Sequence, residues 1–199
     1  MIRSAVTLAV RLLCGCRARH LAAPAGPGPR IYYANHTSNL DAIVVWASLP
    51  EPCRSNCRIV AAKDYWGAGP VRRWLACRVF GALLIERKRV TRGNNPLTGI
   101  NQALDEGRSI VIFPEGTRSC DGRLQYPFKK GGFHLAMESG VPIVPITVVG
   151  SHEVLPKHGK RVKPGKIVLN VGKPIASAGS SMDALMEEVY NSIKLGYTL

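Results

Sequence analysis

Apolar and polar residues alternate along this chain in a repeated strand-and-helix pattern. Short apolar runs of strand length occur at 31–34, 58–62, 81–85, 109–113, 141–145 and 167–171. Helix-like segments lie between and after them, at 42–49, 71–79, 95–106, 134–139 and 181–195. Such alternation is typical of parallel sheets with crossover helices. The pattern predicts an α/β fold, a single-domain sandwich in which helices flank a mostly parallel, twisted sheet.

Two prolines, Pro142 and Pro145, interrupt the apolar run at 141–145. A proline has no backbone N–H to donate to a sheet ladder. We therefore expect this strand at an edge of the sheet, or the prolines at its entrance.

The first twenty residues have the pattern of an amphipathic helix. At ~100° per residue, a broad arc is apolar, and a narrow polar arc holds Arg3, Ser4, Thr7 and Arg11. Arg17 and Arg19 fall at the edges of the apolar arc, from which long basic side chains reach lipid headgroups. Two interpretations are open: a helix that lies in a bilayer surface, and a helix that packs on the domain.

A signal peptide fits this segment less well, because only seven uncharged residues separate Arg3 from Arg11 and no small-x-small cleavage site follows. Residues 22–29 are rich in proline and glycine and predict a hinge. We therefore divide the chain into an amphipathic, membrane-associating segment with its hinge, 1–29, and a main domain, 30–199.

A polar turn, Asn35-His36-Thr37-Ser38-Asn39-Leu40-Asp41, connects the apolar run at 31–34 to the next helix. If Ser38 or Asn39 caps that helix, Asp41 falls in its first turn and His36 stays in the loop. The carboxylate then accepts a hydrogen bond from one imidazole nitrogen, and the other is free to take a proton. This is the arrangement of a general base and its orienting group. The alternative is structural: Asp41 complements the helix N-terminus and His36 ends the strand.

A second polar loop, Phe113-Pro114-Glu115-Gly116-Thr117-Arg118-Ser119, follows the buried run at 109–113. Loops at the ends of parallel strands are where α/β proteins place their sites. The guanidinium of Arg118 suits bidentate recognition of phosphate, and Gly116 lets the backbone approach a ligand closely. His134 has no carboxylate at a suitable spacing, so we interpret it as structural.

The chain of 199 residues carries a formal charge of +14, which calls for an acidic partner such as nucleic acid, an anionic bilayer or a phosphate-bearing substrate. Five lysines and arginines lie within 157–166, a segment expected to be a loop facing anionic lipid or a carrier. Lys129 and Lys130 are either phosphate ligands or a plain basic loop. No run of about twenty apolar residues predicts a membrane span, so membrane contact would be monotopic.

Six cysteines are spread along the chain, at 14, 16, 53, 57, 77 and 120. No second pair or histidine pair follows at zinc-site spacing. We expect reduced thiols that pack as small apolar side chains and hold no metal, which suits a cytoplasmic protein.

Two further segments complete a set of four motifs. In chain order, the set comprises Asn35-His36-x4-Asp41, Gly81-x3-Ile85-x-Arg87, Phe113 to Ser119, and Val141-Pro142-Ile143-Val144-Pro145. In order and spacing they resemble the four motifs of the glycerolipid acyltransferase family, whose best-known members are the 1-acylglycerol-3-phosphate acyltransferases. The resemblance covers roughly residues 30 to 175.

The resemblance implies a domain of the same α/β architecture that uses neither metal nor other cofactor. It implies that His36 is the base and that Asp41 orients it. It associates Arg87 with the acceptor's phosphate and the fourth motif with the acyl-chain side of the site. Members often carry a lysine at the position of Lys63, and two interpretations are open: this lysine helps to hold phosphate or headgroup, or it is simply solvated. Residues implied in acceptor binding are Glu115, Gly116, Thr117 and Arg118.

From these residues we expect an acyltransferase that moves a fatty acyl group from acyl-CoA or acyl-ACP to the sn-2 hydroxyl of 1-acyl-glycerol-3-phosphate, giving phosphatidic acid. Backbone N–H groups near Gly116 or Thr117 are candidate donors to the oxyanion. No Gly-x-Ser-x-Gly elbow is present, so an acyl-enzyme is not required. The expected partners are a lysophospholipid, the acyl carrier and the anionic cytoplasmic face of a membrane, with no nucleic acid.

Three alternatives stay open. The acceptor is another lysophospholipid or a lyso-amino-acid lipid; the chain is a noncatalytic basic protein that binds a membrane surface or nucleic acid; or it is a hydrolase in which His36 activates water. Free fatty acid production would distinguish the hydrolase, and steeply salt-dependent binding without turnover would indicate the binding protein.

Overall fold

The computed structural model describes residues 2–20, 28–86, 95 and 97–199. Arg87 lies outside the described residues, as does most of the expected hinge at 22–29. Within the described part of the chain, seven strands form one sheet in the order β1-β7-β6-β2-β5-β3-β4. They are β1 (Arg17–His20), β2 (Ile31–Ala34), β3 (Cys57–Ala62), β4 (Leu83–Ile85), β5 (Ser109–Ile112), β6 (Ile143–Val149) and β7 (Val168–Val171).

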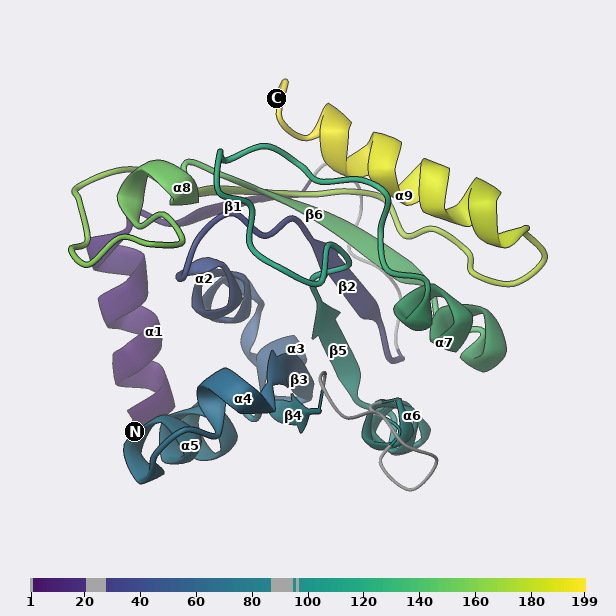
Figure 1. Ribbon diagram of the computed structural model, residues 1–199, viewed down its shortest axis with the longest axis horizontal. Coiled ribbons are helices and arrows are strands. Elements are labelled where there is room, and N and C mark those ends of the chain that lie inside the picture. Colours follow the sequence, from purple (N-terminus) through teal and green to yellow (C-terminus); the bar gives the residue numbers. More distant parts are fainter. Residues whose placement is uncertain (1, 21–27, 87–94, 96) are drawn as a thin grey trace.

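The described strand pairs are parallel except for β6 and β7, which run antiparallel (Figure 1). Helices cover both faces. On the first face lie α1 (Ile2–Leu13), α2 (Asp41–Ser48) and the π-helix η1 (Leu75–Val79), and on the second lie α6 (Thr98–Asp105), α7 (Gly131–Ser139) and α9 (Met182–Leu195). The predicted α/β sandwich with a mostly parallel sheet is confirmed.

Each face of the sheet has its own core. Trp46 of α2 and Phe80 after η1 pack on the first face, and Phe133 of α7 and Leu185 of α9 pack on the second. Four short helices lie in connections: α3 (Glu51–Ser55), α4 (Lys63–Trp66), α5 (Pro70–Trp74) and α8 (Ser151–Val154). All six cysteines are unpaired, and Cys14 and Cys57 are buried.

The proline-containing strand β6 is central, between β2 and β7, so its predicted position at an edge is wrong. Pro142 does lie at the strand entrance. The carbonyl of Pro145 accepts a hydrogen bond from the backbone N–H of Gly172 at 2.9 Å. Because the nitrogen and carbonyl of one strand residue face the same neighbour, the nitrogen of Pro145 points toward the chain just beyond β7. Its missing N–H therefore leaves the ladder to β2 intact.

The N-terminal helix ends at Leu13, and the expectation that it continues to residue 20 is wrong. Gly15 has a φ of +51°, a left-handed conformation that suits glycine after a helix, and the chain turns there. Arg17 and Arg19 then lie in β1, which pairs with β7. Residues 17–20 thus belong to the same sheet as the main domain.

The side of α1 that faces the domain combines part of the polar arc with Val6 and Val10 of the apolar arc. Thr7 is only 5% exposed, and Arg3 and Arg11 each donate a hydrogen bond to a backbone carbonyl of the domain at 3.2 Å. Leu8 and Leu12 are 59% and 74% exposed, so part of the apolar arc faces outward. None of the described helices has the length and hydrophobicity needed to cross a membrane.

Candidate active site

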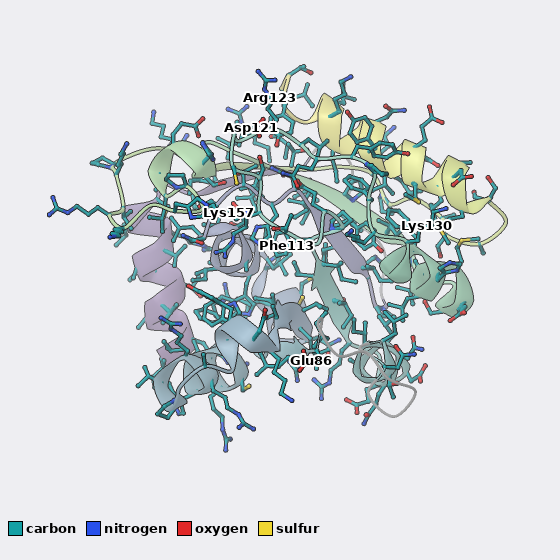
Figure 2. The ribbon with its side chains drawn as sticks, in the orientation of Figure 1. Glu86, Phe113, Asp121, Arg123, Lys130 and Lys157 are labelled. Atoms are coloured by element: carbon teal, nitrogen blue, oxygen red, sulfur yellow. The ribbon has the colours of Figure 1, made fainter. Side chains whose placement is uncertain are left out.

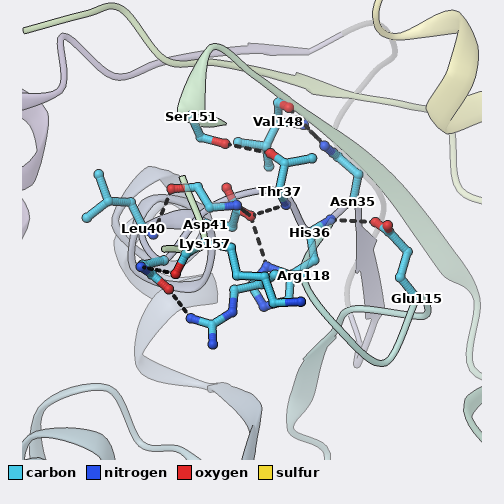
Figure 3. A network of polar contacts seen from close by, with 12 residues as sticks. Asn35, His36, Thr37, Leu40, Asp41, Glu115, Arg118, Val148, Ser151 and Lys157 are labelled. Carbon is cyan, nitrogen blue, oxygen red and sulfur yellow. Dashed lines mark hydrogen bonds and ion pairs between the residues drawn. The ribbon is translucent and has the colours of Figure 1, made fainter. Parts of the chain in front are cut away.

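His36 and Asp41 meet at the C-terminal ends of the central strands (Figure 3). The Nδ1 atom of His36 lies 2.9 Å from Oδ2 of Asp41, and Asp41 is fully buried. An imidazole that keeps its proton on Nδ1 for this carboxylate presents an unprotonated Nε2. No hydrogen bond within the described residues occupies Nε2, so the pair has the geometry predicted for a base and its orienting group.

The turn before α2 is closed by Asp41 itself. We predicted that Ser38 or Asn39 caps the helix, but the N-cap residue is Leu40 and no side chain caps it. Instead, Oδ2 of Asp41 accepts hydrogen bonds from the backbone N–H groups of Thr37 and Ser38, both at 2.7 Å. The carboxylate therefore fixes the shape of the turn as well as the imidazole.

The 113–119 loop holds His36 from the other side. The ring of Phe113 stacks on the imidazole, with centroids 4.1 Å apart, and Figure 2 shows Phe113 near the middle of the molecule. The backbone N–H of His36 donates to Oε1 of Glu115 at 2.5 Å, and its carbonyl accepts from the N–H of Ser119 at 2.8 Å. The two predicted motif loops thus meet at this histidine.

Glu115 is buried, with 4% of its surface exposed. Burial raises the pKa of its carboxyl to about 7, although hydrogen bonds from the N–H groups of His36 and Gln125 favour the charged form. Glu115 is not among the residues lining the adjacent cavity. Its side chain contacts the backbone of the histidine, and the role in acceptor binding that the resemblance implies stays a prediction.

Arg118 reaches the turn from the 113–119 loop. Its guanidinium donates a hydrogen bond to the side-chain oxygen of Asn39 and lies 5.4 Å from the ring centroid of Tyr65 on α4. The side chain lines the same cavity as His36. This places a cation at the cavity beside His36, and a guanidinium suits bidentate contacts to a phosphate.

A cavity of about 710 Å³ opens beside His36. Most of its lining is aliphatic or aromatic, contributed by α2, β3, α4, η1, β5 and α6. Four polar lining residues come from the two motif loops, His36, Asn39, Thr117 and Arg118, and we call them the polar end of the cavity; Asp64 of α4 and Lys129 also line it. An apolar cavity with a few polar groups at one end suits a ligand with a hydrocarbon chain and a polar head.

The remaining predicted residues differ in their position. Gly116 and Thr117 line the cavity, but the N–H of Gly116 donates to the carbonyl of Phe113 at 3.1 Å. The N–H of Thr117 makes no hydrogen bond within the described residues. Lys63 is exposed at the start of α4 and is not part of the lining; His134 is exposed on α7.

Three supporting residues were not identified from the sequence. The side-chain nitrogen of Asn35 donates a hydrogen bond to the carbonyl of Val148 in β6 at 2.9 Å. Its side-chain oxygen accepts one from the backbone N–H of Val148 at 2.6 Å. The hydroxyl of Ser151 lies 3.1 Å from that of Thr37, and Asn39 holds Arg118. Asn35 and Asn39 stand within the motif, which was the available signal, whereas nothing local marks Ser151.

A family model described as Acyltransferase matches residues 19–149. The chain belongs to the acyltransferase family. In this acyltransferase chain both polar loops, the turn from His36 to Asp41 and the loop from Phe113 to Ser119, lie within the matched residues. The resemblance drawn from the four motifs is confirmed.

Curated relatives carry the name 1-acyl-sn-glycerol-3-phosphate acyltransferase. The alpha protein of Mus musculus is 32% identical over 170 residues, which cover 83% of this chain and 57% of the relative. The chloroplastic protein BAT2 of Brassica napus is 34% identical over 171 residues, covering 85% of this chain and 47% of the relative. The chain thus spans about half the length of the curated relatives it matches.

A solved structure agrees over nearly the whole chain. The crystal structure of the 1-acyl-sn-glycerophosphate (LPA) acyltransferase PlsC from Thermotoga maritima superposes with a TM-score of 0.78 and 26% sequence identity, covering 98% of this chain and 76% of that chain. The described sheet, its flanking helices and the N-terminal helix are therefore the acyltransferase fold.

Proposed function

We propose that this chain transfers a fatty acyl group from an acyl-CoA or acyl-ACP thioester to the sn-2 hydroxyl of 1-acyl-glycerol-3-phosphate, giving phosphatidic acid. The observation that carries the proposal is the position of His36. Its Nδ1 is held by a buried carboxylate at 2.9 Å, and its ring lines a cavity with mainly apolar walls. The names of the relatives and of the solved structure support the same acceptor.

This geometry supports direct acyl transfer by general-base catalysis. Nε2 of His36 takes the proton of the sn-2 hydroxyl while that oxygen attacks the thioester carbonyl carbon. Asp41 holds the tautomer and stabilises the imidazolium. When the tetrahedral intermediate collapses, the carbon–sulfur bond breaks and the imidazolium returns its proton to the leaving thiolate. General-base assistance of this kind is worth about 10²- to 10⁴-fold in rate.

Basic residues bind the polar parts of the substrates in this proposal. Arg118 binds the phosphate of the acceptor, together with Arg87, for which the resemblance is the support. Lys63 is a further cation for the headgroup. The N–H of Thr117 donates to the oxyanion. No metal or other cofactor takes part.

The protein is proposed to act at an anionic membrane surface, at its cytoplasmic face. Leu8 and Leu12 expose apolar surface on α1, and Val71 and Trp74 do so on the neighbouring basic helix α5. Ile2 and Arg3 of α1 and Trp74 line one shallow pocket, so the two helices are side by side. Apolar side chains among arginines suit the interface of an anionic bilayer.

The test is thiol release from oleoyl-CoA and oleoyl-ACP in detergent micelles, across a panel of lysophospholipids, lyso-amino-acid lipids and glycerol 3-phosphate. We expect release that requires 1-acyl-glycerol-3-phosphate and is lost in His36→Ala, with phosphatidic acid as the product. Release with another acceptor alone would replace the substrate. Free fatty acid as the product would indicate a hydrolase, and no release with any pair would support the binding protein.

A further inference from the structure

The cavity beside His36 is lined by residues from both faces of the sheet. On the first face its walls include Ile43 of α2, Ile59 of β3 and Ala82, which belong to the core under α2 and η1. On the second face they include Leu97 and Ile112, which belong to the core under α6 and α7. We call these the α2 branch and the α6 branch.

The two branches meet where the ladder between β3 and β5 ends, before the C-terminal ends of these strands. β3 pairs with β5 only from Cys57 to Ile59. From Val60 to Ala62, β3 pairs with β4 on its other side, while β5 continues to Ile112 beside β2. The ladder is therefore open at the C-terminal ends of β3 and β5, next to His36.

Each branch has a cation near its polar end. Arg118 is bonded to Asn39, which precedes α2, so its charge lies toward the α2 branch. Lys129 lines the cavity and runs along Gly116, where an added Cβ would approach the lysine stem to 3.0 Å. Two and three residues further on, Gly131 and Gly132 line the α6 branch at the start of α7.

We propose that the two branches hold two different hydrocarbon chains at once. The α6 branch takes the acyl chain of the donor, and the α2 branch takes the chain that the lysophospholipid acceptor already carries. This inference rests on the proposed function, because it assigns both substrates of that reaction to the same site.

Both substrates of the proposed reaction have a long apolar tail, and their reacting atoms must meet at His36. Two tails that enter along opposite faces of a sheet do not compete for volume. The arrangement also directs the acceptor's phosphate to Arg118 and leaves Lys129 for the phosphate-bearing carrier of the donor. The branching therefore fits a two-tailed complex.

The proposal can be tested by narrowing one branch at a time. Gly131→Leu narrows the α6 branch, because a Cβ there meets only Leu97, at 3.9 Å. Ala82→Leu narrows the α2 branch from a half-buried position. Leu97→Phe and Ile43→Phe repeat the two changes at other positions, and thermal unfolding checks that each variant is folded. Turnover is measured against series of donors and of acceptors with chains of increasing length.

We expect each pair of variants to affect the chain-length profile of one substrate only. Narrowing the α6 branch lowers kcat/KM for long-chain donors relative to short-chain donors by about tenfold or more and leaves the acceptor profile unchanged. Narrowing the α2 branch does the same for acceptors and leaves the donor profile unchanged. If all four variants shift the donor profile alone, one bent chain occupies both branches and the proposal is overturned; unchanged profiles also overturn it.

A binding measurement separates this inference from the proposed reaction. Equilibrium dialysis with radiolabelled palmitate, below its critical micelle concentration, is expected to give two bound molecules per wild-type chain. This count does not depend on turnover, so two bound molecules with no acyl transfer would retain the branched site and reject the proposed reaction. A single bound molecule would reject the two-chain site even in an active enzyme.

Discussion

The polar end of the cavity and its apolar walls are held by different forces. At the polar end, His36 is fixed by a carboxylate, a stacked ring and two backbone hydrogen bonds. The walls are aliphatic side chains such as Ile59 and Ile112, which contact their neighbours without directional bonds. An unpaired buried polar group costs about 1–3 kcal/mol, so the polar end tolerates little change, whereas the walls can vary in volume and alter specificity.

The largest effect is expected at the carboxylate that holds the turn. In Asp41→Asn the amide oxygen can replace Oδ2, while the amide nitrogen takes the position of Oδ1, which has no hydrogen-bond partner within the described residues. The turn and the imidazole keep their geometry, but the imidazolium loses its counter-charge. We expect kcat to fall by about 10²-fold or more, with only a modest loss of thermal stability, measured by thiol release and by calorimetry.

Asp183→Asn is the matched control for this change, because Asp183 is an exposed carboxylate at the start of α9. It is expected to leave both kcat and stability unchanged. Retention of near-normal kcat in Asp41→Asn would mean that the charge of Asp41 plays no part in catalysis and that its role is limited to the shape of the turn.

The next largest effect is expected at the cation of the polar end. Arg118→Ala removes a guanidinium that lines the cavity and leaves His36 in place. We expect KM for the phosphate-bearing acceptor to rise by about tenfold or more, since charge-assisted hydrogen bonds are worth about 1.5–3 kcal/mol, with a smaller change in kcat. Arg118→Lys should recover part of the loss, because it restores charge without the planar fork.

Arg123→Ala is the control for that variant, since Arg123 lies in the same loop region but is largely exposed. Steady-state kinetics with varied acceptor at saturating donor compares the acceptor KM of Arg118→Ala with that of Arg123→Ala. An unchanged acceptor KM in Arg118→Ala would assign the arginine to holding Asn39 alone.

The difference between the polar end and the apolar walls of the cavity also explains which features the sequence could predict. Strands such as β2 and β5 and the His36–Asp41 pair are marked by local pattern, since apolar runs and a five-residue spacing are read within one segment. By contrast, β1 consists of Arg17-Ala18-Arg19-His20, which has no apolar run, and only its pairing with β7 makes it a strand.

Long-range features left no local signal. The contact of Ser151 with Thr37 joins residues 114 positions apart. Likewise, the end of the β3–β5 ladder after Ile59 depends on the pairing of strands that are far apart in the sequence. Motif spacing therefore predicted the polar end well, whereas the extent of the cavity required the structure.

A smaller effect, on stability more than on turnover, is expected at Glu115. Burial raises the pKa of this carboxyl from its ordinary value near 4.5 to about 7. A raised pKa contributes stability that is fully present below pH 4.5 and is lost as the pH rises to 7, in total about 3 kcal/mol. Glu115→Gln stays neutral, so its melting temperature should fall less than that of the wild type between pH 4.5 and 7.

Glu138→Gln, an exposed position on α7, serves as the control for Glu115→Gln and should follow the wild-type pH dependence. Melting curves at closely spaced pH values provide the comparison. Parallel curves for the wild type and Glu115→Gln would mean that the carboxyl titrates near its ordinary value despite its burial.

The smallest effect on turnover is expected at α1. Leu8→Gln combined with Leu12→Gln removes two exposed apolar side chains and touches neither the core nor the cavity. If α1 lies in a membrane surface, binding to vesicles containing anionic lipid, measured by co-sedimentation, should fall severalfold, while turnover in detergent micelles stays unchanged. Leu195→Gln alters a similarly exposed leucine of α9 and should change neither. Equal vesicle binding by the double variant and the wild type would leave α1 with packing as its sole role, since Thr7 and Arg11 already join it to the domain.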